Sequence, residues 1–225
     1  MNGNLARRIV AEGLGTAFLL AAVVGSGIMA ERLAGGNVAL ALLANTIATS
    51  AALVSLILTF GPISGAHLNP VVTLVFTTRD NLRESVAYIL AQVGGAIAGV
   101  VTANLMFSLP PMSLSHHTRS GRAQFFSECV ATLGLLVVIR VGVKFQPRTI
   151  AFAVAAYIAA AYWFTASTSF ANPAVTLARS LTDTFTGIRP VDVPAFLLAQ
   201  LVGLLAAMSL TRWLIAGPSR NDFND

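Results

Sequence analysis

The chain has 225 residues, of which 56% are hydrophobic and only 10% charged, and its mean hydropathy is +0.76. Soluble domains carry roughly 25% charged residues, so this composition excludes a water-facing globular protein and predicts an integral membrane protein. The net charge is +5, but the basic residues lie in gaps between apolar runs and form no cluster with aromatic residues. We therefore expect the lipid bilayer as a partner and no nucleic acid.

Charge-poor runs define the predicted spans. A bilayer core of about 30 Å needs roughly 20 apolar residues in one helix. Four runs of suitable length occur, at residues 5–30, 85–110, 123–143 and 193–211. Two further runs, 33–78 and 149–178, contain no Asp, Glu, Lys or Arg and are too long for a single span.

Both overlong runs have the same internal order, a full span, a polar break and a short apolar tail. The three parts lie at 37–60, 61–68 and 69–78 in the first run, and at 149–166, 167–171 and 172–182 in the second. At about 1.5 Å per residue, tails of this length reach only half-way across a bilayer. The prediction is an all-α membrane protein with six transmembrane helices and two re-entrant half-helices.

The chain contains an internal duplication. A glutamate, an Asn-Pro pair and a glutamine follow one another twice, as Glu12, Asn69-Pro70, Gln92 and as Glu128, Asn172-Pro173, Gln200. Three spans per copy is an odd number, so the second copy must be inverted relative to the first. We expect one channel domain over 1–225, with repeats at about 5–108 and 123–216 and a connecting loop at 109–122.

Charge asymmetry predicts the orientation. With a cytoplasmic N-terminus, nine Lys and Arg residues fall on the cytoplasmic side and five on the other. This bias favours cytoplasmic N- and C-termini in a multi-pass protein of the cell membrane, such as a bacterial inner membrane. Glu12 lies within the first apolar run, so a cleavable signal peptide is not expected.

The two Asn-Pro pairs predict a constriction at the middle of the membrane. Asparagine is a good N-cap, and proline at the next position loses no hydrogen bond there. Two half-helices that meet at their N-termini direct free N–H donors and positive dipole ends at one place, which suits neutral solutes and repels cations. The residues expected to form this constriction are Asn69, Pro70, Val71, Asn172, Pro173 and Ala174.

The sequence here resembles the aquaporin and aquaglyceroporin (major intrinsic protein) family. The segments 64–73, SGAHLNPVVT, and 169–174, SFANPA, are close to its two signatures, with Val71 in place of the usual alanine, and the resemblance covers about residues 5–216. It implies six spans around one pore per subunit, a homotetramer, and no cofactor. It also implies that Glu12 and Glu128 accept hydrogen bonds from the re-entrant loops, which His67, Gln92 and Gln200 help to support.

The resemblance further implies a selectivity filter of four positions. Counted from the two asparagines, they fall on Thr49, Ala160, Ser169 and Val175. Water-selective members usually have Phe, His, a small residue and Arg there, so this filter is expected to lack both the aromatic residues and the arginine. A wide, arginine-free ring favours small uncharged polyols. The pattern also resembles aquaglyceroporins encoded beside bacterial arsenic-resistance genes, which implies transport of arsenite and methylated arsenicals.

Other functions remain open at this point. An ordinary water-selective aquaporin is one alternative, and a proton-coupled transporter is another, for which Glu12 and Glu128 are the intramembrane carboxylates. No nucleophile and base pair and no metal motif occurs, so neither an enzyme, nor catalytic residues, nor a metal site is expected. We expect Cys129 to be an apolar filler and His116-His117 to be a solvated loop pair.

Overall fold

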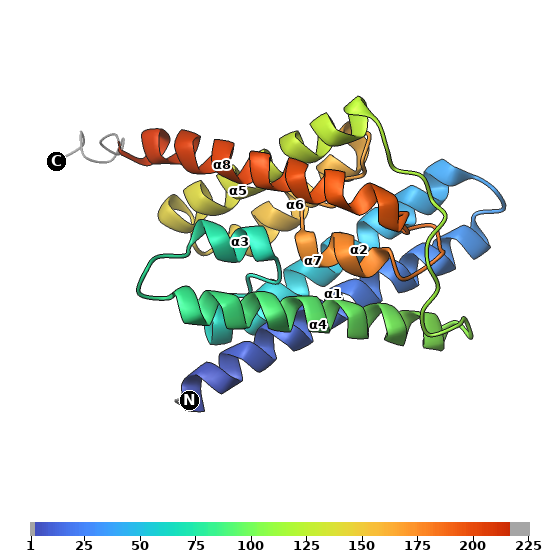
Figure 1. The fold of residues 1–225 in the computed structure, drawn as a ribbon, viewed down its shortest axis with the longest axis horizontal. Coiled ribbons are helices and arrows are strands. Elements are labelled where there is room, and N and C mark those ends of the chain that lie inside the picture. Colours follow the sequence, from blue (N-terminus) through green and yellow to red (C-terminus); the bar gives the residue numbers. More distant parts are fainter. Residues whose placement is uncertain (1–2, 217–225) are drawn as a thin grey trace.

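The computed structural model describes residues 3–216, and the regular structure in this range is helical. Figure 1 shows the helices running roughly along one direction, with two short helices, α3 and α7, in the interior. The elements in chain order are α1 (Gly3–Leu33), α2 (Val38–Ser64), α3 (Pro70–Val75), α4 (Leu82–Met106), α5 (Arg122–Phe145), α6 (Ile150–Phe164), α7 (Pro173–Arg179), the 3₁₀ helix η1 (Pro190–Asp192) and α8 (Val193–Ala216).

The fold is the predicted one of six long helices and two half-helices. Five of the long helices are apolar and long enough to cross a membrane, whereas α6 has only 15 residues. At 1.5 Å per residue, α6 covers about 22 Å, less than a bilayer core. The helix ends early because the chain turns extended at Thr165 and begins the re-entrant loop there.

Helix α2 is longer than expected. The polar break was predicted to begin at Gly61, yet the helix continues through Pro62 to Ser64. It ends at Gly65, whose φ of 91° is left-handed and whose N–H donates to the carbonyl of Gly61. A glycine adopts this conformation without steric cost, so Gly65 rather than Pro62 stops the helix.

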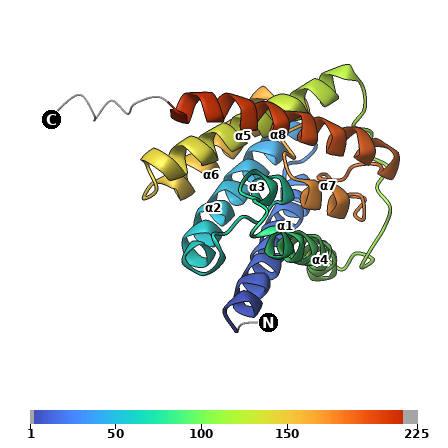
Figure 2. The same ribbon diagram turned by 60° about the vertical axis from the view of Figure 1, so that its left-hand side comes forward.

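The two halves of the chain are arranged alike. Helix α1 packs against α2 and α4, and α5 packs against α6 and α8 in the same way, while α2 and α6 join the halves. Figures 1 and 2 show α3 and α7 between α4 and α8. The half-helices contact each other and both of these long helices, so they are enclosed by the bundle.

Glycines allow the closest helix contacts within each half. A Cβ on Gly95 of α4 would lie 2.0 Å from the carbonyl oxygen of Gly13 in α1, and a Cβ on Gly203 of α8 would lie 2.8 Å from that of Cys129 in α5. Both distances are too short for a side chain. Gly95 lies three residues after Gln92, and Gly203 lies three residues after Gln200. The two contacts are therefore at equivalent positions of the duplication.

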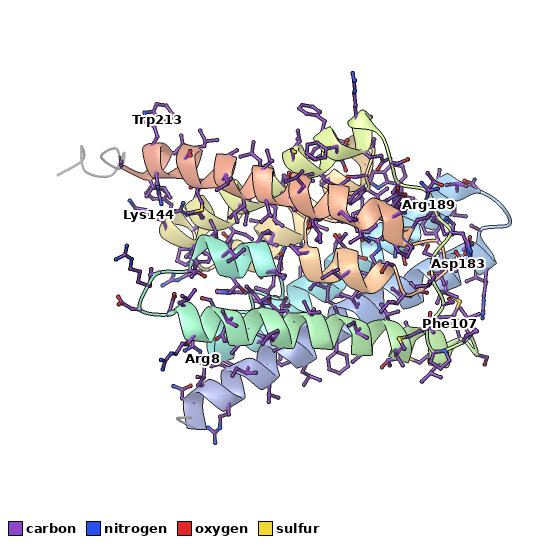
Figure 3. The ribbon with its side chains drawn as sticks, in the orientation of Figure 1. Arg8, Phe107, Lys144, Asp183, Arg189 and Trp213 are labelled. Atoms are coloured by element: carbon purple, nitrogen blue, oxygen red, sulfur yellow. The ribbon has the colours of Figure 1, made fainter. Side chains whose placement is uncertain are left out.

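The bundle has two distinct ends. We name the end where α1 begins the inner end and the opposite one the outer end. Figure 3 shows Arg8 and Lys144 at the inner end, and Asp183 and Arg189 at the outer end. Helix α8 ends at the inner end, the same end at which α1 begins (Figure 1). Two faces of the bundle, on α4 and α8, expose Leu90 and Leu205, as expected for contact with lipid.

Candidate functional site

An asparagine caps the N-terminus of each half-helix. Asn69 is extended, with a φ of −161°, and its Oδ1 accepts a hydrogen bond of 3.0 Å from the N–H of Val71. Asn172 is equally extended, and its Oδ1 accepts from the N–H groups of Ala174 and Val175 at 3.0 and 3.3 Å. The following proline occupies the first helical position in both cases.

The same asparagines connect the two half-helices. The side-chain amide of Asn69 donates to the carbonyl of Ala171 at 2.8 Å, and that of Asn172 donates to the carbonyl of Leu68 at 2.9 Å. Each asparagine thus caps its own helix through oxygen and binds the opposite loop through nitrogen. This reciprocal pair brings the two Asn-Pro segments together at the centre of the bundle.

The loops before the asparagines have an unusual backbone. Left-handed, non-glycine residues occur three and one positions before each asparagine, namely Ala66 and Leu68 in the first loop and Ser169 and Ala171 in the second. Such residues cost about 1–3 kcal/mol each and persist only where surrounding contacts hold them. The loop N–H groups point to one side as a result, where a single acceptor can bind two of them.

Two buried glutamates are those acceptors. Glu12 binds the N–H groups of His67 and Leu68 at 2.9 and 2.7 Å, and Glu128 binds those of Phe170 and Ala171, both at 2.9 Å. Both side chains are fully buried. The predicted loop contacts of Glu12 and Glu128 are thus present in the structure, and neither glutamate lines the central cavity.

The two glutamines complete the support. Gln92 donates from Nε2 to Glu12 at 2.8 Å and to the hydroxyl of Thr73 at 2.9 Å. Gln200 donates to Glu128 and to the hydroxyl of Thr176 at the same two distances. Each glutamine therefore joins a loop-binding carboxylate to the half-helix that follows, which fixes the half-helix relative to the bundle.

A cavity of about 510 Å³ runs between the two ends of the bundle. Its wall contains Arg8 and Glu84 at the inner end, both capping asparagines in the middle, and Thr49 and Arg179 towards the outer end. The rest of the wall is mostly apolar and comes in equivalent pairs from the two halves, with Leu19, Val23, Leu53 and Ile57 from the first and Leu135, Ile139, Val154 and Ile158 from the second. The wall thus combines polar groups at several levels with a mostly apolar surface.

Three of the four expected filter residues line this cavity. They are Thr49, Ser169 and Val175, all buried. Ala160 does not, because it is exposed on the outside of α6. Tyr162 of the same helix is buried in the wall instead, and its hydroxyl lies 3.4 Å from the hydroxyl of Thr49. The assignment of Ala160 to the filter, made by counting back from Asn172, was therefore wrong, and the aromatic side chain of Tyr162 lines the cavity there instead.

The cavity also contains an arginine. Arg179, the last residue of α7, lines the wall and lies over the ring of Phe170 at 3.5 Å from the centroid. The absence of arginine at position 175 therefore does not make the cavity free of arginine. Sequence reasoning assigned Arg179 only to the outer-side charges. The available signal was its spacing, because residues four apart lie on the same face of a helix.

A different set of side chains lines the inner end of the cavity. Arg8 forms a two-point ion pair with Glu84 and lies over the ring of Tyr88. His67 stacks on Phe76, with 5.6 Å between the ring centroids, and its Nδ1 lies 3.2 Å from the hydroxyl of Thr73. His67 is thus a wall residue bonded within its own half.

The loop 107–121 folds over the outer end. The backbone N–H and Nδ1 of His116 bind the carboxylate of Asp183 at 2.8 and 2.9 Å. These hydrogen bonds lower the pKa of Asp183 below its ordinary value. Within residues 3–216, no group of three or more His, Cys, Asp or Glu side chains is placed to hold a metal ion, and Cys129 is a half-buried free thiol.

The sequence matches the family described as Major intrinsic protein over residues 2–144, well over half of the chain. The chain belongs to the major intrinsic protein family. Aquaglyceroporin AqpS of Rhizobium meliloti is 56% identical over 214 residues, which are 94% of this chain and 91% of that protein. Aquaporin NIP1-1 of Arabidopsis thaliana is 33% identical over 122 residues, which are 53% of this chain and 38% of that protein.

A solved structure has the same fold. The X-ray structure of the aquaglyceroporin from Plasmodium falciparum superposes with a TM-score of 0.64 at 24% identity, and the match covers 93% of this chain and 95% of that chain. The predicted family and fold class are thereby confirmed.

Proposed function

We propose that this protein is a passive channel for small uncharged solutes, with glycerol-like polyols, arsenite and its methylated derivatives, and water among them. The observation that carries the proposal is the central cavity, whose wall combines polar groups at several levels with a mostly apolar surface. A polyol presents hydroxyls on one side and carbon on the other, so it matches both kinds of group. Membership of the major intrinsic protein family supports the same function.

Polar groups in the wall supply hydrogen-bond partners at successive levels of the passage. The Asn69 and Asn172 amides offer donors at the centre, and Thr49 and Ser169 line the wall towards the outer end. These groups replace the hydration that a neutral solute loses, and the pair of asparagines forms the central constriction.

Arsenite fits this passage on chemical grounds. At neutral pH it is the uncharged trihydroxide, which resembles a small polyol in size and in its three hydroxyls. The identity of 56% with a protein described as an aquaglyceroporin supports a passage wider than one for water alone. Valine at position 175 supports it too, because a guanidinium there would occupy the cavity that Val175 leaves open.

One observation favours the alternative of a water-selective channel. Tyr162 and Phe170 both stand in the cavity wall, and the hydroxyl of Tyr162 reaches towards Thr49 from the opposite half of the molecule. Aromatic rings at this level narrow the passage relative to the ring of small residues expected from the sequence. Water permeation relative to glycerol permeation distinguishes the two functions.

A proton-coupled transporter is less well supported. Glu12 and Glu128 are fully buried, accept several hydrogen bonds each and do not line the cavity. Those bonds connect each carboxylate to a re-entrant loop and not to the passage. The two carboxylates therefore act as supports for the loops, and the channel is not an enzyme and uses no cofactor.

The proposed setting is a bacterial inner membrane, with four copies assembled as a homotetramer and both termini in the cytoplasm. The charge bias of nine to five supports the orientation, and the exposed apolar faces suit contact with lipid or with further copies. Arg220 and the C-terminus lie outside the described residues. The unit is a single channel domain over 1–225, with its repeats at about 5–108 and 123–216.

Stopped-flow light scattering on proteoliposomes tests the proposal. Vesicles with purified protein are exposed to a hyperosmotic step that drives water out, and then to inward-directed gradients of glycerol and of arsenite. We expect glycerol and arsenite influx well above that of empty vesicles. Water flux without glycerol or arsenite flux would establish the water-selective alternative, and no flux of any neutral solute would reject a channel altogether.

A further inference from the structure

Two arginines lie beside the outer part of the cavity without an acidic partner. Arg179 is only 3% exposed, and Arg119 of the loop 107–121 lies beside the same aromatic ring. The salt bridges within residues 3–216 involve neither of them. A buried guanidinium without a carboxylate is costly, and ionisable groups within a membrane protein usually mark a pathway. The position of Arg179 therefore requires an explanation.

The side chain of Arg179 is held so that its terminal nitrogens reach the cavity. Its Nε donates to the carbonyl of Thr186, and its guanidinium rests on the ring of Phe170. Neither Nη atom makes a hydrogen bond to the described residues, and neither is among their fully buried unpaired atoms. Because Arg179 also lines the cavity, these two nitrogens face the passage.

Arg119 binds the same two segments that Arg179 contacts, next to Thr186 and in the loop that carries Phe170. It donates from Nε to the carbonyl of Gly187 at 2.7 Å and from Nη1 to the carbonyl of Ser167 at 3.3 Å. Its guanidinium lies 5.0 Å from the centroid of the Phe170 ring, against 3.5 Å for Arg179. The two positive charges are thus closer to each other than the Debye length of about 10 Å in 0.1 M salt, and their fields add in the passage.

We propose that Arg179 is a specificity-determining residue that excludes protons and metal cations from the outer part of the pore, with Arg119 as its positioning residue. Arg179 lies four residues after Val175 on α7, so it presents its charge one helical turn further out. A cation must pass this charge after losing part of its water shell, whereas a neutral solute meets only two more hydrogen-bond donors. This inference rests on the proposed channel function.

The test measures cation and glycerol permeation in the same proteoliposomes. Arg179→Met keeps a long side chain against Phe170 but removes the charge. Arg32→Met is the matched control, because Arg32 also lies over an aromatic ring, at 5.1 Å from the centroid of Phe107, and also binds a carbonyl, but it is exposed and outside the cavity. Proton and Na⁺ leak is followed with an internal pH dye and by ²²Na⁺ uptake.

We expect Arg179→Met to raise the cation leak at least about tenfold over the wild type, as removal of one poorly screened charge should, while Arg32→Met stays at the wild-type level. Arg179→Lys, which keeps a charge, should stay tight. The double variant Val175→Arg/Arg179→Met should restore exclusion, and it keeps the inference testable if the single Arg179→Met variant does not fold. Arg119→Met should give a smaller leak than Arg179→Met.

Two results would overturn the inference. One is an Arg179→Met variant that leaks cations no faster than the wild type while its glycerol flux is intact. The other is a Val175→Arg/Arg179→Met variant that leaks cations as fast as the single Arg179→Met variant. The glycerol measurement separates this failure from failure of the channel function, because a wild-type protein that passes no neutral solute would reject the channel itself.

Discussion

The two half-helix regions share a scaffold and differ in the side chains that they present to the cavity. Equivalent glutamates bind equivalent loop N–H groups, and the four corresponding distances lie between 2.7 and 2.9 Å. The glutamine and threonine contacts repeat at identical distances. The duplication has therefore kept the groups that determine the backbone.

The difference lies two positions before and seven positions after each asparagine. In the inner half these positions are His67 and Phe76, whose rings stack on each other. In the outer half they are Phe170 and Arg179, which form a cation–π contact. The same backbone thus carries an aromatic pair at one end and a positive charge at the other. One scaffold can carry two chemically different ends because the glutamates and glutamines that support it do not line the cavity.

The largest expected effect comes from breaking the shared scaffold. Glu128→Ala removes the acceptor of two backbone N–H groups and of Gln200. Each buried donor left unpaired costs about 1–3 kcal/mol, so we expect a loss of about 3 kcal/mol or more in the free energy of unfolding. Thermal unfolding of the detergent-solubilised protein measures this loss.

Glu12→Ala should be as damaging as Glu128→Ala, because its contacts are the same. Glu31→Ala, at an exposed glutamate of α1, should leave the melting temperature unchanged. A stable Glu12→Ala variant beside an unstable Glu128→Ala variant would contradict the equivalence of the two halves.

The next effect concerns the outer half alone. Val175→Arg places a second guanidinium in the cavity wall one turn from Arg179. We expect glycerol flux to fall at least about tenfold, equivalent to about 1.4 kcal/mol of added barrier. Val191→Arg, at an exposed residue of η1, serves as the control and should leave the flux unchanged. Unchanged glycerol flux in Val175→Arg would remove Val175 from the filter.

A smaller effect distinguishes the two candidate positions on α6. Tyr162→Ala should raise the flux of polyols larger than glycerol several-fold, because it removes a ring from the cavity wall. Ala160→Phe should leave every flux unchanged, because its side chain points away from the cavity. Stopped-flow measurements with erythritol compare the two variants. An effect of Ala160→Phe without an effect of Tyr162→Ala would place Ala160, and not Tyr162, in the filter.

The smallest effect is expected at the outer loop, which has no counterpart at the inner end. Hydrogen bonds from His116 lower the pKa of Asp183, so its ionised form adds stability above its ordinary pKa of about 3.9, and this contribution is lost as the pH falls through the lowered pKa. Asp183→Asn should cost below about 1 kcal/mol at pH 7, as at other surface pairs. The difference between the melting temperatures of the two proteins should shrink as the pH falls from 7 towards 3. A constant difference across this range would exclude the carboxylate as its cause.

Much of this arrangement could be predicted from the sequence. The duplicated motifs predict which glutamate supports which Asn-Pro loop. The same order of Glu, Asn-Pro and Gln occurs in both halves of the chain, and this leaves few other topologies. The residues of the filter depend instead on helical phase. Two residues correspond to about 200° of rotation around a helix. A two-residue error in the alignment of α6 therefore assigned the outward-facing Ala160 to the filter instead of the inward-facing Tyr162.

Two other features could be recognised only in the three-dimensional structure. The role of Arg179 depends on which face of a seven-residue helix meets the cavity, and a basic residue near the end of an apolar run has an ordinary interpretation as a topology signal. The extension of α2 through Pro62 depends on Gly65, whose left-handed conformation ends the helix three residues later. Neither is specified by composition or by spacing alone.

The most direct test of the account is glycerol influx into sealed proteoliposomes with and without an imposed pH gradient. A passive channel should bring internal glycerol to the external concentration and no further, at the same rate under both conditions. Accumulation above the external concentration, or influx that requires the pH gradient, would contradict a passive channel built on two supported half-helices.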